Sequence, residues 1–352
     1  MSVGCGDVGV ALIGSGQVAQ ALARQIDARG THAGGTTLSL RQAINARASL
    51  RPQRADWLPT LTRLAAQPRL TRADPVPQLA DDIDVVVDLS ASDAVAAEHA
   101  IWLRRGIAVI TANKRGLGGA AERAHAIHAA IREPSDYGDA ATVGAGLGAV
   151  RRLRELHACG EPVLSIAGVL SGTLAWLFDQ FDGSQPFSTL VRQAHALGYT
   201  EPDPRDDVGG GDVLRKLRIL ARAVGWPVSD EFIAMDPRLH CAHGSDPWHD
   251  IQALDLGLAA LIAGRPAPSA RLAVVARATA GQGRIGIEWL AADDPLAQRS
   301  GCDNAIVIHS QRYRERPLVL RGPGAGPELT AAAVYEDLLA AVRARGWRRR
   351  AA

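Results

Sequence analysis

The chain has 352 residues, a hydrophobic share of 47% and a formal net charge of +2. That length predicts two domains, or one large α/β body, with enough apolar residues for a core. The near-neutral charge argues against nucleic-acid or membrane binding. Because the four cysteines follow no metal or disulfide spacing and no apolar run is long enough to cross a bilayer, we expect a cytoplasmic protein.

The N-terminal segment predicts a strand, a glycine turn and a helix. Residues 8–13 are an apolar run, which Gly14-Ser-Gly-Gln-Val-Ala follows, and apolar residues then recur at helical spacing. In this setting glycines let a pyrophosphate approach the N-terminus of a helix. The alternative is a tight turn without a ligand. We therefore expect a dinucleotide to bind at Gly14, Ser15, Gly16, Gln17 and Val18.

The second predicted strand covers residues 38–47 and bears on the choice of cofactor. In NAD-binding folds this strand usually ends in an acid that bonds the ribose hydroxyls. No acid stands between Asp27 and Asp56, whereas Asn45 and Arg47 stand near the end of the strand. This slightly favours NADP over NAD, but arginines are common throughout the chain and NAD stays open.

Two further strands are predicted over residues 83–89 and 107–110, with a helix over 93–105 between them. Ser90 follows the first strand and Lys114 follows the second. Ligands of open α/β sheets bind at the carboxyl ends of strands, so Lys114 is expected where a substrate or nicotinamide would lie. The alternative for Lys114 is a charge that only caps its loop.

The remaining chain predicts a second, mixed domain. A small-residue loop over 140–148 precedes a strand at 163–170, and Ser171 is placed to cap the next helix. Further helices are expected at 186–197, 247–262 and 328–343, and further strands at 272–279, 285–290, 305–309 and 317–320. The sequence thus predicts an α/β protein with a Rossmann-type domain over 1–147 and a mixed α+β substrate and dimerisation domain over 148–321. Residues 322–352 are expected to pack back on the first domain.

Residues 198–216 are rich in acids and glycines and lead into an amphipathic helix. The acids are Glu201, Asp203, Asp206, Asp207 and Asp212. Asp212 and Lys216 are four residues apart on the border of the apolar stripe, where a side chain can reach a half-buried cleft. Arg215, Arg218 and Arg222 are expected to face solvent.

Lysine is scarce in this chain. Lys and Arg together number 39, yet only Lys114 and Lys216 are lysines. An ammonium group can give up a proton, whereas a guanidinium stays protonated, so a site that protonates an alkoxide can use lysine. The alternative is an accident of composition.

These segments together resemble the homoserine dehydrogenase family. The motifs that carry the resemblance are the Gly14 turn, Thr111-Ala-Asn-Lys114, Ala141-Thr-Val-Gly-Ala-Gly-Leu, Gly168-Val-Leu-Ser-Gly-Thr173, the block from Glu201 to Lys216, and Gly324-Ala-Gly326. The resemblance implies NAD(P)H-dependent reduction of L-aspartate 4-semialdehyde to L-homoserine, a step toward threonine and methionine. Hydride delivery leaves negative charge on the aldehyde oxygen, which a lysine can neutralise.

The resemblance also implies roles for individual residues. Lys216 would protonate the aldehyde oxygen with Asp212 as its partner, and Lys114 would lie between substrate and nicotinamide. Glu201 and Asp207 would hold the substrate ammonium. Substrate contacts are also implied for Gly198, Tyr199 and Thr173, and cofactor contacts for the Gly14 turn, Ser90, Lys114 and Gly326. A homodimer is expected, with neither a preceding kinase domain nor a following regulatory domain.

Two departures from the family pattern leave alternatives open. Backbone carbonyls of Val143, Ala145 and Leu147 would bind Na+ or K+ in this family, but Ala140 replaces the usual glutamate, which puts the ion in question. Ala175 and Trp176 replace a common asparagine and tyrosine, so the substrate pocket is expected to differ. The alternatives are a related dehydrogenase of another amino-acid aldehyde or alcohol, and a non-catalytic nucleotide-binding homologue.

Overall fold

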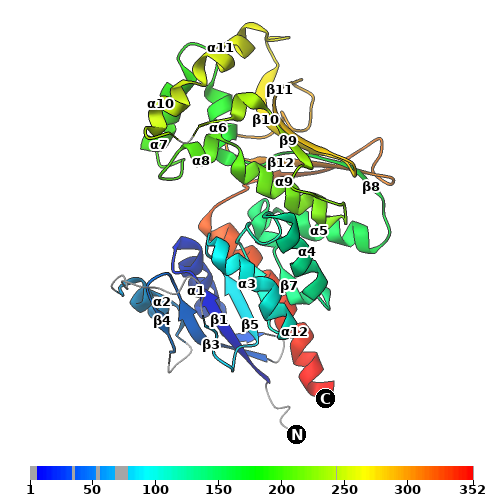
Figure 1. The fold of residues 1–352 in the computed structure, drawn as a ribbon. Coiled ribbons are helices and arrows are strands. Elements are labelled where there is room, and N and C mark those ends of the chain that lie inside the picture. The colour runs from blue at the N-terminus through cyan, green and yellow to red at the C-terminus, as the bar shows by residue number, and fades with distance from the viewer. Residues whose placement is uncertain (1–5, 34–35, 53–55, 68–77, 243, 352) are drawn as a thin grey trace. The chain divides into compact units, whose positions relative to one another are not determined.

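The computed structural model describes residues 6–33, 36–52, 56–67, 78–242 and 244–351 (Figure 1). The chain divides into two compact units, one formed by Met1–Gly148 with Ala325–Ala352 and the other by Ala149–Gly324. Among the described residues, no helix combines the length and the apolar character needed to span a bilayer. The predicted α/β class is confirmed.

The first unit is built on a mainly parallel sheet. Its strand order is β2-β3-β1-β5-β6-β7, with β4 paired to β3. The pairs β1–β3, β1–β5, β5–β6 and β6–β7 are all parallel, as a dinucleotide-binding sheet requires. The strands are β1 Gly6–Ile13, β2 His32–Ala33, β3 Thr36–Ile44, β4 Ser49–Leu50, β5 Val85–Asp88, β6 Ala108–Thr111 and β7 Tyr137–Gly138.

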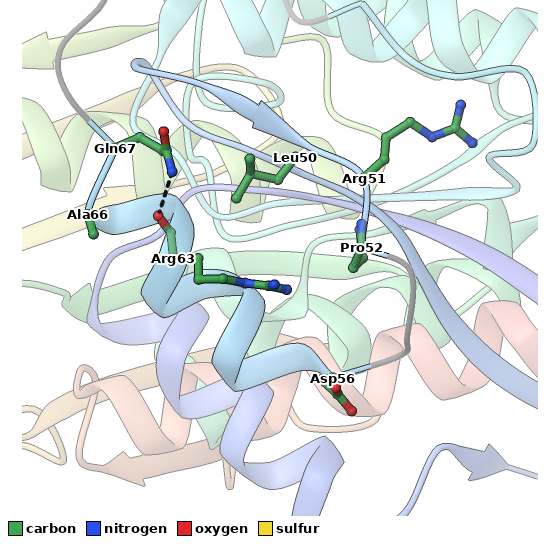
Figure 2. A pocket seen from close by; sticks show the side chains of 7 residues that line it. All are labelled: Leu50, Arg51, Pro52, Asp56, Arg63, Ala66 and Gln67. Atoms are coloured by element: carbon green, nitrogen blue, oxygen red, sulfur yellow. Dashed lines mark hydrogen bonds between the residues drawn. The ribbon is translucent and has the colours of Figure 1, made fainter.

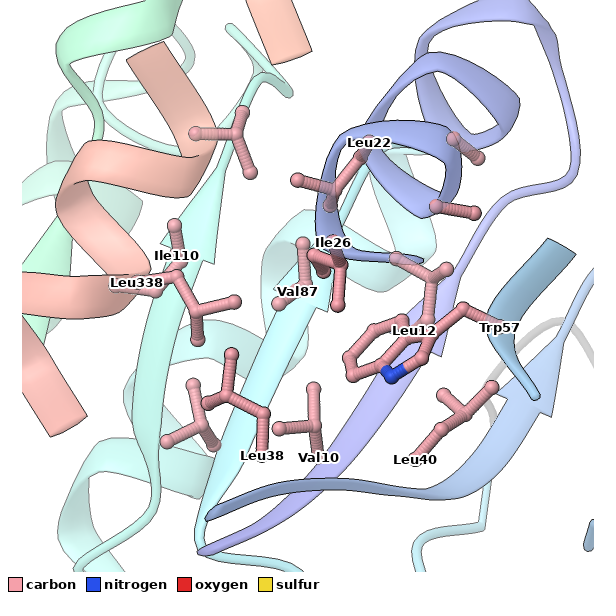
Figure 3. Close-up of a cluster of buried hydrophobic side chains, with 14 of the residues drawn as sticks. Val10, Leu12, Leu22, Ile26, Leu38, Leu40, Trp57, Val87, Ile110 and Leu338 are labelled. Atoms are coloured by element: carbon pink, nitrogen blue, oxygen red, sulfur yellow. The ribbon is translucent and has the colours of Figure 1, made fainter. Parts of the chain in front are cut away.

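Helices enclose this sheet and form its core with it. They are α1 Gln17–Arg29, α2 Trp57–Ala65, α3 Asp93–Arg104, α4 Ala121–Ala130 and α12 Pro327–Ala351, with short 3-10 turns η1 Pro134–Asp136, η2 Ala140–Thr142 and η3 Ala145–Leu147. Figure 3 shows Leu22 and Ile26 of α1, Trp57 of α2 and Leu338 of α12 against the sheet. Each is fully buried, and a side chain of this kind contributes about 1.5–3 kcal/mol on burial. The C-terminal helix, red in Figure 1, thus belongs to the first unit.

The second unit has a mixed six-stranded sheet with order β13-β12-β8-β10-β11-β9. Its pairs are antiparallel except β11–β9. The strands are β8 Val163–Val169, β9 Ile233–Met235, β10 Arg271–Ala278, β11 Gly283–Leu290, β12 Asn304–Ser310 and β13 Leu318–Gly322. The helices are α5 Ala149–Ala158, α6 Gly172–Gln180, α7 Phe187–Ala196, α8 Arg205–Val208, α9 Gly211–Ala223, α10 Pro247–Gln252 and α11 Asp255–Ala263, with the 3-10 turn η4 Pro237–Leu239.

The single helix predicted over 247–262 is wrong, because the chain forms α10 and α11 with a break between them. The carboxylate of Asp255 accepts hydrogen bonds from the backbone N–H and the hydroxyl of Ser188 on α7, at 2.8 and 2.7 Å. This tertiary contact anchors the first residue of α11, and local periodicity does not reveal it. The Ser171 cap is confirmed, since its Oγ accepts from the Leu174 N–H at 3.2 Å.

Candidate active site

The glycine turn after β1 leaves the N-terminus of α1 open. Gly14 has a φ of 114°, and a Cβ there would lie 3.0 Å from the Leu89 carbonyl oxygen, so only glycine fits. A Cβ on Gly16, the N-cap residue, would meet nothing within 4 Å. Within this fully described helix, no side chain caps the N-terminus and no acid lies in the first turn. The first amide groups of α1, from Gln17 and Val18 onward, can therefore receive an anion.

Asn45 orders the end of β3 beside this turn. Its Nδ2 donates to Ser15 Oγ at 3.1 Å and to the Leu64 carbonyl at 3.2 Å. Its Oδ1 accepts from the backbone N–H groups of Arg47 and Ala48. These four bonds tie the glycine turn, the β3 end and α2 together. Two predicted cofactor residues, Ser15 and Asn45, are thus in direct contact.

Arg47, which follows β3, contacts the C-terminal end of α2. This contact lies near a pocket that the sequence did not predict. The guanidinium of Arg47 donates to the Ala65 carbonyl at 3.3 Å. Ala66 and Gln67, which follow Ala65, help to line a pocket of about 580 Å³. Figure 2 shows the side chains around it: Leu50, Arg51, Pro52, Asp56, Arg63, Ala66 and Gln67. Two of these side chains are arginines; Arg51 is paired with Asp82 at 2.8 Å, which leaves Arg63 as the guanidinium better placed for an anionic group.

A buried carboxylate connects the loops that carry Ser90 and Lys114. Asp88, at the end of β5, is fully buried. Its Oδ1 accepts from the Ser90 N–H at 2.9 Å and the Ser90 hydroxyl at 2.6 Å, and its Oδ2 accepts from Asn113 Nδ2 at 2.9 Å. Lys114 follows directly and is half-buried. Sequence reasoning missed Asp88, although an acid at the end of an apolar run was a usable signal.

The small-residue loop and the start of α12 have unusual backbone conformations. Ala145 has a φ of 45° between Gly144 at 72° and Gly148 at 68°. A non-glycine residue in this region costs about 1–2 kcal/mol, and such strain concentrates at functional sites. This is the segment of Val143, Ala145 and Leu147. Gly326, with a φ of 128°, precedes α12, and its carbonyl accepts the Thr330 N–H.

In the second unit, Lys216 lies on α9 with its ammonium held by two acceptors. Gly210, at a φ of 69°, starts this helix, and Asp212 lies in its first turn, where the helix dipole favours a carboxylate. Lys216 Nζ is 2.8 Å from Asp212 Oδ2 and 2.7 Å from the Leu170 carbonyl oxygen. The residue is 7% exposed. The expected pairing of Asp212 with Lys216 is therefore present.

The acidic segment before α9 forms a second cluster. Asp207 Oδ2 accepts the Glu201 N–H at 2.7 Å, and the Thr173 hydroxyl donates to the Tyr199 carbonyl at 2.8 Å. Burial, reinforced by the charges of Glu201 and Asp212, raises the pKa of Asp207 to about 6, against the lowering effect of hydrogen bonds from Glu201 and Thr173. Gly198, at a φ of 75°, permits the turn into this cluster.

Two expectations for this unit concern the substrate pocket at Trp176, which stays a prediction, and the exposure of Arg222. The pocket was expected to differ at Trp176, whose ring lies 5.5 Å from that of Tyr199 in an edge-to-face contact. The expectation that Arg222 faces solvent is wrong. The residue is buried, its guanidinium donates to the Val228 carbonyl at 3.1 Å, and burial together with Arg218 lowers its pKa to about 10. Helix α9 packs against α5 and β10, which the helical wheel alone does not show.

The predicted residues thus gather in two places, one in each unit. Ser15 joins Asn45, and Ser90 joins the base of the Lys114 loop, in the first unit. Lys216 joins Asp212, and Glu201 joins Asp207, in the second. Lys114 and Lys216 belong to different units, and their convergence on one substrate stays a prediction.

Comparison with known families gives a consistent assignment. A model of the homoserine dehydrogenase family matches residues 149–339, and a model described as "Homoserine dehydrogenase, NAD binding domain" matches residues 14–135. The bifunctional aspartokinase/homoserine dehydrogenase 2 of Escherichia coli K12 is 40% identical over 264 residues, which are 73% of this chain and 32% of that protein. The chain thus spans about a third of that relative. The homoserine dehydrogenase of Emericella nidulans is 35% identical over 279 residues, covering 72% of this chain and 74% of that one.

Solved structures agree on the fold. A Candida auris protein of unknown function has a TM-score of 0.80 at 27% identity, covering 95% of this chain and 98% of that one. A hyperthermophilic archaeal homoserine dehydrogenase in complex with NADPH has a TM-score of 0.74 at 22% identity, covering 95% and 97%. The two family models together account for most of the chain, and they include the Gly14 turn and the Glu201–Lys216 block. The chain therefore belongs to the homoserine dehydrogenase family, with an NAD(P)-binding domain.

Proposed function

We propose that this chain reduces L-aspartate 4-semialdehyde to L-homoserine with NADPH or NADH, and catalyses the reverse oxidation. The observation that carries the proposal is the ammonium of Lys216, 7% exposed and bonded to Asp212 and the Leu170 carbonyl. A proton donor held this way can protonate an oxygen that gains negative charge. The family match favours this reaction over that of a related aldehyde or alcohol, and over a non-catalytic role.

In the proposed mechanism the second unit binds the substrate and handles the proton. Glu201 and Asp207 bind the substrate ammonium, because two carboxylates in one cluster match a single positive group. Tyr199, Thr173 and Gly198 shape this cluster through the Thr173–Tyr199 hydrogen bond and the turn at Gly198. Lys216 donates its proton to the aldehyde oxygen, and Asp212 keeps the lysine oriented and stabilises its charge before transfer. Lys114 is assigned to the space between substrate and nicotinamide.

The residues of the first unit fit a dinucleotide. The uncapped N-terminus of α1 and the open space above Gly16 suit a pyrophosphate, which Gly14, Ser15, Gly16, Gln17 and Val18 would hold. Ser90, Lys114 and Gly326 are assigned to the remaining contacts. When bound, the nicotinamide supplies or accepts the hydride.

We further propose a preference for NADP. Asn45 and Arg47 take the place where an acid would bind the ribose of NAD, and Arg51 and Arg63 line the adjacent pocket. A 2′-phosphate would gain from these guanidinium groups, whereas NAD would not. The NADPH complex of the archaeal homoserine dehydrogenase is consistent with this preference.

The monovalent cation is proposed at the backbone of Val143, Ala145 and Leu147. The left-handed Ala145 supports it, since a strained turn of this kind directs successive carbonyl groups to unusual positions. Rates with Na+, with K+ and with neither test the site. Restoring the family's glutamate with Ala140→Glu should strengthen any cation dependence. Rates that do not respond to either ion, in both proteins, would remove the proposal.

These assignments give the two units different roles. We propose that the first unit, including α12, binds the cofactor, while the second unit binds substrate and mediates formation of a homodimer. Sedimentation measurements test the dimer. The cytoplasmic location expected from the sequence stays a prediction.

The direct test is steady-state turnover of L-homoserine with NADP+ and with NAD+, followed through the absorbance of the reduced nicotinamide. Homoserine should be preferred over analogues that lack its amino group or change its chain length. Preference for another amino alcohol would replace the proposed substrate. Tight cofactor binding without turnover of any of them would instead indicate a non-catalytic homologue.

A further inference from the structure

A fully buried polar cluster lies beneath the loop that carries Lys114. It consists of Asp88 at the end of β5, His99 on α3 and Tyr137 on β7, with exposed fractions of 0%, 0% and 2%. Buried polar groups are retained when they are hydrogen-bonded and serve a definite arrangement. The proposed reaction assigns no role to His99 or Tyr137.

For a neutral His99 ring, the hydrogen bonds of this cluster fit one tautomer. His99 Nε2 is 3.0 Å from Asp88 Oδ2, and His99 Nδ1 is 3.0 Å from the Tyr137 hydroxyl. Both oxygens of Asp88 also accept bonds from Ser90 and Asn113, so we assign the carboxyl group as acceptor and Nε2 as donor. In the neutral ring Nδ1 then accepts, and the Tyr137 hydroxyl donates to it. Both ring nitrogens are satisfied by this single tautomer.

The cluster holds the loop on both sides of Lys114. On one side, Asn113 Nδ2 donates to Asp88 Oδ2 at 2.9 Å. On the other side, Gly116 packs directly on the histidine–tyrosine pair. A Cβ at Gly116 would lie 2.5 Å from the Tyr137 hydroxyl oxygen and 3.1 Å from His99 Nδ1. A residue two positions before Gly116 has little freedom to move when both of its flanks are fixed.

The same carboxylate also fixes the neighbouring loop. Asp88 Oδ1 accepts both the backbone N–H and the hydroxyl of Ser90, and Asn113 Nδ2 lies 3.5 Å from that hydroxyl. Rotation of Asp88 would therefore displace the Ser90 and Lys114 loops together. His99 adds a restraint on this rotation to those of Ser90 and Asn113, since its Nε2 shares Oδ2 with Asn113.

We infer that His99 and Tyr137 are positioning residues of this enzyme, which act through Asp88 and Gly116 to hold Ser90 and Lys114 in place for the cofactor and substrate. Neither side chain touches the reacting atoms in this scheme. The tests that measure turnover rest on the proposed function. The test that measures the tautomer of His99 does not depend on it.

Three variants test the arrangement in the full-length protein. His99→Leu removes both ring nitrogens, Tyr137→Phe removes only the hydroxyl, and His99→Gln keeps a donor that reaches Asp88. The matched control is Leu61→Ala, which opens a cavity in the core of the same unit on α2. Melting temperature, NADPH affinity and the kinetic constants for homoserine are measured for each variant.

We expect His99→Leu to lose about tenfold or more in kcat, with a smaller loss for Tyr137→Phe and near recovery in His99→Gln. The KM for homoserine should stay within about twofold, because Glu201 and Asp207 belong to the other unit. Leu61→Ala should lower the melting temperature without this loss in kcat. Equal kcat in His99→Leu and Leu61→Ala, per folded protein, would reduce the cluster to a structural role and overturn the inference.

Two further readouts separate this inference from the proposed function. In protein labelled with 15N-histidine, the signal that disappears in His99→Gln should show the neutral form protonated at Nε2. A signal from the form protonated at Nδ1 would overturn the arrangement. Should the wild type turn over no homoserine, the proposed function fails, yet weaker NADPH binding in His99→Leu than in Leu61→Ala would still support the positioning role. Equal NADPH binding in the two would refute it.

Discussion

Replacing Asp207 by asparagine should move stability and substrate affinity in opposite directions. Burial and nearby acids raise the pKa of Asp207 from 3.8 to about 6 in the folded protein. The folded state therefore binds this proton more tightly than the unfolded chain does. The contribution of Asp207 to the free energy of unfolding is greatest below pH 3.8, and it falls as the pH rises toward 6. The shift of about two pKa units sets an upper limit of about 3 kcal/mol on the destabilisation of the folded state by the ionised carboxylate at pH 7, and solvent screening of this part-exposed group reduces it.

The neutral amide of Asp207→Asn avoids this penalty and still accepts the Glu201 N–H. We expect the variant to be more stable than the wild type by up to about 3 kcal/mol at pH 7, and by about half of that at pH 5. Urea denaturation of both proteins at the two pH values measures the difference. Asp206→Asn is the control, because the neighbouring Asp206 is exposed and should change little.

Substrate affinity should respond in the opposite sense. The homoserine ammonium requires the ionised carboxylate, so Asp207→Asn should raise KM about 10- to 100-fold, the loss of a hydrogen bond between charged groups. In the wild type, kcat/KM should fall about tenfold per pH unit below pH 6, and this limb should disappear in the variant. A variant that is less stable at pH 7 would show that the Asp207 carboxylate does not destabilise the fold, and an unchanged KM would show that it does not bind the substrate.

The remaining predictions concern proton transfer, cofactor choice and helix capping. Lys216→Arg should fold normally and lose about 10²- to 10⁴-fold in kcat, while the exposed exchange Arg277→Lys leaves kcat unchanged; near-wild-type activity in Lys216→Arg would place the proton donor elsewhere. Arg47→Glu should shift the ratio of kcat/KM for NADP+ over NAD+ toward NAD+ by tenfold or more, and an unchanged ratio would remove Arg47 from the cofactor site. Ser171→Ala should lower the free energy of unfolding of the second unit by about 1 kcal/mol in urea, and no change would mean that α6 does not depend on its cap.

The parts that the sequence predicted well are those set by local patterns. The Gly14 turn was predictable because an apolar run, a glycine pair and helical periodicity follow one another within a few residues. The contact of Lys216 with Asp212 was predictable because residues four apart on a helix are neighbours, and the observed separation is 2.8 Å. The second acceptor of Lys216, the Leu170 carbonyl, is 46 residues away and left no local signal.

The buried cluster of Asp88, His99 and Tyr137 illustrates what local patterns leave out. Its members come from β5, α3 and β7, and the bonds that join them span 11 and 38 residues. Taken singly, each is an ordinary residue at the end of a strand or on a helix. Only the parallel pairing of β5, β6 and β7 brings them under one loop. The predicted exposure of Arg222 was wrong for a related reason, since tertiary packing decides its burial.

The geometry around Lys216 explains why an arginine-rich chain keeps lysine there. An ammonium presents its donors from one nitrogen, whereas a guanidinium spreads five donors over a rigid plane. Asp212 and the Leu170 carbonyl both approach the same nitrogen, at 2.8 and 2.7 Å, in a site that is 7% exposed. A guanidinium would have to move this donor outward or separate the two acceptors. Asp212 lies in the first turn of α9, where the helix dipole favours a carboxylate, so it is placed to orient the ammonium.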